Sequence, residues 1–163
     1  MEEAVTWFQS SAFPIESEYP WKGERGASCN PNGAGPLAGA RVGSWEKLNN
    51  LTDEELRSAL NSGPVIVKLT GDKSTIENFQ AGNVISNCGN NPNTHGEFWG
   101  TLVGFHNKNW VNEDNGHVIG KRTWRIKMAN GPNYGDGGYI WIDVNGGICG
   151  VNSEVYILTS ANY

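Results

Sequence analysis

The chain has 163 residues, which is enough for one domain or for two small lobes sharing a core that needs no structural metal. With 22 Gly and 18% charged residues, its composition is typical of a turn-rich β or α+β protein and argues against a helical bundle. The net charge of -5 is scattered and includes no basic run, so we expect neither nucleic acid nor an anionic membrane as a partner.

Targeting signals are not evident. No apolar stretch approaches the length that crosses a bilayer, so no membrane insertion is expected. The N-terminus, Met1–Glu3, has neither the basic start nor the apolar run of a secretory signal. If the protein is exported, its signal lies outside this sequence, and the compartment stays unknown.

The three cysteines are widely spaced along the chain. Cys29, Cys88 and Cys149 are too few and too far apart to form a zinc site with the three histidines, so neither a metal nor another cofactor is expected. In an oxidising compartment the odd number predicts one intrachain bridge and one cysteine left over. In a reducing compartment all three remain free thiols.

The first part of the chain combines a short helix with a long loop. Glu2–Ser11 spaces its apolar residues as a short amphipathic helix does. Prolines and glycines break up the path that follows, and Asn30–Gly43 is too rich in Gly, Pro and Ala to hold regular structure. We therefore place a lobe boundary in this loop, with one lobe at residues 1–42 and the other at residues 43–163.

A second helix has clear start and stop signals. Thr52 is a suitable N-cap, Glu55 completes a capping box, and Gly63-Pro64 ends the helix. Five apolar or alternating segments then predict strands at Val65–Leu69, Trp99–Phe105, Val118–Met128, Tyr139–Val144 and Glu154–Leu158. Helical material followed by strands at hairpin-like spacing predicts an α+β fold with an antiparallel sheet or barrel.

No single motif here predicts catalysis, and the order of short segments is more informative. Glu18–Gly23, with the sequence EYPWKG, leads to Cys29, and Thr52–Pro64 leads to Val65–Val67. The later segments are Cys88-Gly89, Leu102–Phe105, Thr123–Lys127, Gly131, Gly135–Ile140 and Gly147–Val151. In this order and at this spacing, the segments resemble papain-like cysteine peptidases related to cathepsin L, over essentially the whole chain.

The resemblance implies the papain-like α+β fold. In that fold an antiparallel β-barrel forms the right lobe, and this chain would retain an incomplete remnant of the helical left lobe. Relatives of this kind are lysosomal or secreted, which does not settle the compartment of a chain that carries no signal peptide.

The resemblance also implies a degenerate catalytic site. The family's chemistry needs a cysteine thiolate, a histidine, an asparagine that orients the imidazole, and a glutamine at the oxyanion. The cysteine and glutamine belong to a segment expected before Met1, so we expect both to be missing from this chain. The histidine position falls on Phe98, counted from Val103–Phe105, and the asparagine position falls on Met128. A phenyl ring accepts no proton, and a thioether cannot hold an imidazole tautomer.

His95 offers an alternative alignment. Its distance from Cys88 is one that some cathepsins use for their own histidine. This alignment requires three extra residues before the strand, absorbed by a bulge at the strand's start, and it does not restore the asparagine. We favour Phe98. Around Met128, moreover, Asn130 and Tyr134 replace the family's two tryptophans, which reduces the aromatic cover of the site.

The remaining implications concern cysteines and partners. The resemblance implies a disulfide between Cys88 and Cys149, and it leaves Cys29 unpaired because its family partner lies in the absent segment. The N-terminal helix would pack on that same segment, so its apolar side chains are expected to face solvent until a partner protein covers them. The residues of this expected interface are Val5, Trp7, Phe8, Tyr19 and Trp21.

Two functions therefore compete. The first is a non-catalytic pseudopeptidase that acts as a structural or binding subunit of a larger assembly. The alternative is the histidine and asparagine side of a split or processed cysteine peptidase whose partner chain carries the catalytic cysteine.

Overall fold

The structure is a computed structural model that describes residues 1–10, 41–111 and 118–160. Among the described helices, none is long and apolar enough to span a membrane. In chain order the elements are α1 (Glu2–Ser10), β1 (Val42–Asn49), α2 (Asp53–Leu60), β2 (Val65–Asp72), α3 (Lys73–Glu77), β3 (His95–Val111), β4 (Val118–Lys127), β5 (Tyr139–Asp143), the 3-10 turn η1 (Ile148–Gly150) and β6 (Glu154–Ser160).

Two compact units make up the chain. The first comprises Met1–Glu46 together with Leu158–Tyr163, and the second comprises Lys47–Ile157. The division into lobes at residues 1–42 and 43–163 stays a prediction.

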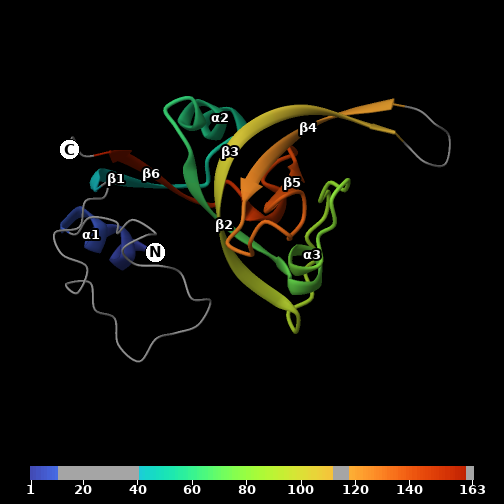
Figure 1. The fold of residues 1–163 in the computed structure, drawn as a ribbon, viewed down its shortest axis with the longest axis horizontal. Helices are drawn as coiled ribbons and strands as arrows, with labels where there is room; N and C mark the ends of the chain where they lie inside the picture. The colour runs from blue at the N-terminus through green and yellow to red at the C-terminus, as the bar shows by residue number, and fades with distance from the viewer. Residues whose placement is uncertain (11–40, 112–117, 161–163) are drawn as a thin grey trace. The chain divides into compact units, whose positions relative to one another are not determined.

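The strands form one six-stranded sheet in the order β1-β6-β2-β3-β4-β5. Antiparallel pairing joins β2 to β3 and β6, β3 to β4, and β4 to β5. Figure 1 shows β3 and β4 as two long, curved strands that lie side by side. Few helices and an antiparallel sheet confirm the predicted α+β class.

The core of the second unit follows the period-two alternation of its strands. In β2 the side chains of Val65, Val67 and Leu69 are buried, whereas the intervening residues are half-buried. Leu56 of α2 is fully buried as well. Removing one such side chain from water contributes about 1.5 to 3 kcal/mol. Further buried members of this core are Ile76, Leu102, Trp124, Ile126, Ile140, Ile142, Val151 and Val155.

Helix α2 begins at the predicted capping box. The Thr52 hydroxyl accepts a hydrogen bond from the Glu55 backbone N–H at 3.2 Å, and the Glu55 carboxylate accepts one from the Thr52 N–H at 2.8 Å. These bonds, led by the one from the Thr52 backbone, hold the pKa of Glu55 below its usual value. After the helix, Gly63 has φ +138°, which a side chain would strain. The two sequence signals therefore act at the two ends of the helix.

Strand β1, helix α3 and the turn η1 were not predicted, and three strands, β2, β3 and β6, are longer than predicted. Strand β1 has little buried alternation, and α3 has only five residues, so neither has a strong periodic signal. Strand β3 begins at His95 because β2 continues to Asp72 and pairs with it there. Gly71 and Gly96, which read as strand breakers in the sequence, face each other in this extension. A Cβ on Gly71 would lie 2.7 Å from Cys88 Cβ, so the glycine lets the Cys88 segment pack against β2.

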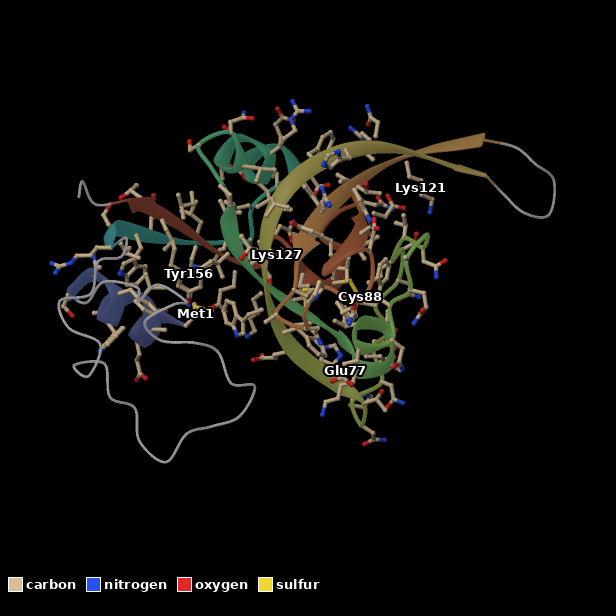
Figure 2. All side chains as sticks on the ribbon, viewed as in Figure 1. Met1, Glu77, Cys88, Lys121, Lys127 and Tyr156 are labelled. Atoms are coloured by element: carbon tan, nitrogen blue, oxygen red, sulfur yellow. A yellow bond between two sulfur atoms is a disulfide. The ribbon has the colours of Figure 1, made fainter. Side chains whose placement is uncertain are left out.

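A disulfide joins Cys88 to Cys149, the pairing that the resemblance implied. Their Cα atoms are 5.2 Å apart, and 61 positions separate them in sequence. Both side chains are buried in the core of the second unit, and Figure 2 labels Cys88 there. The bond ties the segment after α3 to the turn that precedes β6.

Replacing both cysteines (Cys88→Ser with Cys149→Ser) should lower the free energy of unfolding by about 4 kcal/mol, because the reduced chain regains the entropy of an open loop. Guanidinium unfolding of the oxidised wild type, the reduced wild type and the double variant measures this loss. The reduced wild type and the double variant both lack the bond, so their free energies of unfolding should agree and each serves as a control for the other. An unchanged midpoint would contradict a stabilising role for the bond.

Candidate functional site

The pairing of β3 with β2 fixes which face each β3 side chain occupies. The register runs without a break from Val65 opposite Leu102 to Asp72 opposite His95. Phe98 lies within this run, opposite Leu69. Successive side chains of a strand point to opposite faces, so Phe98 shares its face with Leu102 and not with His95.

The pairing of β3 with β4 places Met128 on that same face. Thr101 pairs with Lys127, so the next residues along the two strands, Gly100 and Met128, come opposite each other. A Cβ built on Gly100 would lie 2.5 Å from Ile126 Cγ2 and 3.0 Å from Met128 Sδ. The Ile126 and Met128 side chains therefore occupy the space above Gly100.

Phe98 and Met128 thus lie on the same face of two adjacent strands. Met128 is opposite Gly100, and Phe98 is two residues before Gly100 on β3. Met128 is 6% exposed and belongs to the core, while Phe98 is half-buried and packs against it. A Cβ on Gly96 would lie 3.1 Å from Cε2 and Cζ of Phe98, so the ring lies over that glycine. The site that these residues form is apolar. Neither side chain can accept or donate a proton at pH 7.

His95 lies elsewhere. It is exposed at the start of β3, opposite Asp72, on the face that Phe98 does not occupy. The register shift in β3 falls between Leu102 and Gly104, in its pairing with β4. The described strand start therefore has no bulge of the kind that the His95 alignment requires, and the register does not bring His95 and Met128 together.

The face of the sheet that carries His95 is polar, which the sequence did not indicate. Lys68 Nζ lies 2.6 Å from a Glu97 oxygen and 3.7 Å from a Glu154 oxygen. The Tyr156 hydroxyl donates to Glu154 at 2.8 Å, and Lys47 Nζ lies 3.1 Å from the same carboxylate. The Tyr156 bond, followed by the lysines, lowers the pKa of Glu154. Lys47, Lys68 and Glu97 are distant in sequence from one another and from Glu154, so no local pattern could have revealed the whole network.

The loop that follows Met128 is closed by hydrogen bonds. The Met128 N–H donates to the Gly138 carbonyl at 2.9 Å, and the Gly138 N–H donates to the Tyr134 carbonyl at 2.7 Å. The Tyr134 hydroxyl donates to the Ile76 carbonyl in α3. Burial, together with the negative charge of Glu77, raises the pKa of Tyr134 to about 12. Tyr134, identified in the sequence only as a lost tryptophan, is therefore the anchor of this loop on α3.

The expected interface residues are only partly described. Tyr19, Trp21 and Cys29 lie outside the described residues. In α1, Trp7 is 40% exposed and its ring makes an edge contact with Phe8, with ring centroids 4.8 Å apart. The expectation that all of this helix's apolar residues face solvent is wrong for Val5, which is 3% exposed. Residues two apart point about 200° apart on a helix, so Val5 and Trp7 lie on different sides.

Metal ligands do not gather in the described ranges. Across residues 1–10, 41–111 and 118–160, no group of three or more His, Cys, Asp or Glu side chains is placed to hold a metal ion.

Comparisons with known proteins agree with the geometry of the sheet. A model of the papain family of cysteine proteases matches residues 1–159. Cysteine proteinase 2 of Entamoeba histolytica is 26% identical over 149 residues, which cover 91% of this chain and 42% of that protein. Cysteine proteinase EP-B 1 of Hordeum vulgare is 27% identical over 162 residues, which cover 94% of this chain and 40% of that protein. The chain thus spans about two fifths of the length of the curated relatives it matches.

The fold has close counterparts among solved structures. The digestive procathepsin L 3 of the larval midgut of Tenebrio molitor superposes with a TM-score of 0.72 at 19% identity, covering 98% of this chain and 48% of that one. Such a likeness shows the fold, and the papain-like α+β fold that the sequence predicted is confirmed. The family match extends over almost the whole sequence, so the chain belongs to the papain family of cysteine proteases.

The anchoring role of Tyr134 predicts a pH dependence. Its folded pKa of about 12 lies above the usual value of 10, so the stability it provides is complete below pH 10 and is lost as the pH rises toward 12. Over that range the wild type should lose stability relative to the Tyr134→Phe variant, because the phenol must ionise to leave its buried contact. Phenolate absorbance of both proteins, with denaturant unfolding at each pH, measures this. A difference spectrum that titrates at pH 10 would contradict the assignment.

Proposed function

We propose that this chain is a non-catalytic papain-like pseudopeptidase that acts as a structural or binding subunit of a larger assembly. The observation that carries this function is the placement of Phe98 and Met128. The resemblance puts the catalytic histidine and asparagine at these two positions. Two apolar side chains there provide neither a general base nor a group that orients one.

Retention of the scaffold supports the same function. The Cys88–Cys149 disulfide closes the second unit, and a closed loop of hydrogen bonds follows Met128. The disulfide and the loop hydrogen bonds that stabilise the fold are therefore present, while the two positions expected to transfer or orient a proton are apolar. This combination suits a protein whose surface is used for binding, since fold and chemistry are separable. It does not depend on whether a nucleophile segment exists on another part of the protein or on another chain.

The competing function is the histidine-bearing side of a split or processed peptidase. Family membership supports it, because the relatives matched are named cysteine proteinases. In that case the base must come from this chain, and His95 is the histidine that the alternative alignment offers. The exposure of His95 and the unbroken register beside it count against this assignment.

Peptidase activity tests the two functions directly. The protein, isolated in its native assembly, should neither cleave fluorogenic peptides nor react with thiol-directed active-site reagents faster than an ordinary exposed cysteine does. The His95→Ala and Phe98→Leu variants should behave alike in this assay. Activity that falls roughly 100-fold or more in His95→Ala but not in Phe98→Leu would overturn the non-catalytic function and establish the split enzyme.

We further propose a protein partner that covers the N-terminal helix. Trp7 supports this, because a tryptophan 40% exposed on a short helix presents a large apolar surface to solvent. Tryptophan is also the residue type most enriched among side chains that dominate interface energetics. Val5 is buried and is no longer part of this surface, whereas Phe8, in contact with Trp7, is half-buried.

The Trp7→Ala variant should weaken the association with this partner by about 10-fold or more, since hot-spot truncations cost on the order of 2 kcal/mol. The Thr6→Ala variant, which alters the neighbouring exposed residue, should leave the affinity unchanged. Light scattering of the native assembly, with a thermal melt of the isolated chain, measures both. A wild-type monomer that melts cooperatively while solvent quenchers fail to reach Trp7 would argue against the partner.

A further inference from the structure

The outer face of β4 and β5 carries a patch in which cations meet aromatic rings. In β4, Trp124 and Ile126 point into the core, so the odd-numbered residues between and beside them point to the opposite face, where Thr123 is buried, Arg125 is half-buried and Lys127 is exposed. Their partners on β5 follow from the register, in which Arg125 pairs with Trp141 and Lys127 with Tyr139. Lys121 and Lys127 mark two positions along this strand in Figure 2.

The first cation of this face is neutralised by its surroundings. Lys121 Nζ lies 3.3 Å from an Asp143 carboxylate oxygen and donates to the Ser86 hydroxyl at 2.8 Å. This lysine therefore has an acidic partner and a hydrogen-bond acceptor within the protein. It is an ordinary surface ion pair of the kind that contributes little to stability.

Arg125 has aromatic rings where Lys121 has a carboxylate. Its Cζ lies 3.9 Å from the centroid of the Tyr139 ring and 5.4 Å from that of Trp141. Its Nε is buried and has no hydrogen-bond partner in the described part of the chain. The two terminal nitrogens are not buried in this way, and within the described ranges neither forms a hydrogen bond or an ion pair.

Trp141, the more distant of the two rings, is itself held in place. The Trp141 indole N–H donates to the Asp136 carboxylate at 2.8 Å, so that carboxylate already has a donor. The edge of the His106 ring faces Trp141, with centroids 5.3 Å apart. Gly104, which pairs with Arg125, leaves room for this arrangement, because a Cβ there would lie 2.6 Å from His106 Nε2. The guanidinium carbon therefore lies over Tyr139 and close to a Trp141 ring that is itself held in place.

We propose that Arg125, on Tyr139 and Trp141, is a binding site for an oxyanion. A guanidinium offers parallel N–H donors whose spacing matches the two oxygens of a carboxylate or a phosphate group. Since Nε is out of reach, the anion binds end-on, through the two terminal nitrogens. Stacking on the rings removes rotamer freedom in advance, which lowers the entropic cost of binding. The site lies apart from Phe98 and Met128, on the opposite face of β4, and does not depend on the proposed function.

Nuclear magnetic resonance of the ¹⁵N-labelled, disulfide-bonded chain tests the site. Inorganic phosphate, acetate and N-acetyl-glutamate amide are each titrated against chloride at constant ionic strength. The Arg125 Nε–H and Trp141 indole resonances should shift and saturate, while those of residues around Lys121 should not. A linear response no larger than that to chloride in all three titrations overturns the site.

Two variants distinguish binding through the paired N–H donors of the guanidinium from binding through positive charge alone. Arg125→Lys keeps the charge but loses the parallel donors, so the dissociation constant should rise roughly 10-fold or more. Lys121→Gln removes a cation from the same face and should change it by less than about 2-fold. Equal affinity in the wild type and Arg125→Lys would refute bidentate binding. Tighter binding of the blocked glutamate than of acetate identifies a protein-borne carboxylate as the ligand, and equal binding identifies a free anion.

Discussion

The unbroken pairing of β3 with β2 is the constraint on which the rest of the site depends. It assigns every β3 side chain from His95 to Leu102 to one of two faces, and a shift by a single residue would exchange those faces. One face joins the apolar core through Phe98 and Leu102. The other face carries the ion pairs centred on Lys68 and Glu97. The strand register therefore determines which face of the sheet is apolar and which is polar.

The same constraint explains why an exposed histidine and an apolar pair can occur so close in sequence. His95 and Phe98 are three residues apart, yet strand alternation sends them to opposite sides of the sheet. A catalytic base must reach both its nucleophile and the group that orients it. For a histidine on the polar face, the sheet itself lies between the imidazole and Met128. Family membership and the altered site that we propose are therefore compatible within one chain.

Much of the fold could be predicted from the sequence, because its signals are local. The Thr52 capping box and the alternation after Pro64 each specify a feature that the structure contains, whereas the Cys88–Cys149 pairing came from the family resemblance. The extension of β3 to His95 could not be predicted, because glycines at positions 71 and 96 have a low propensity for strands. In the structure Gly71 allows the Cys88 segment to pack closely against β2. The anchoring of Tyr134 and the contact of Arg125 with its rings likewise depend on partners distant in the chain. A sequence pattern shows periodicity, but it does not show which distant segment of the chain packs beside a given residue.

Gly100 and Met128 make the apolar character of this region difficult to change by one substitution. The thioether of Met128 fills space that the glycine leaves open, so the two residues form one packing unit across the strands. An asparagine at position 128 would be shorter than the methionine and would place an amide against apolar neighbours. The void and the unsatisfied amide would each lower stability, and neither is corrected by a change at Phe98 alone. If the site is non-catalytic, as we propose, a gain of catalysis would need several coordinated substitutions with less stable intermediates between them, and this epistasis would oppose a change made one step at a time.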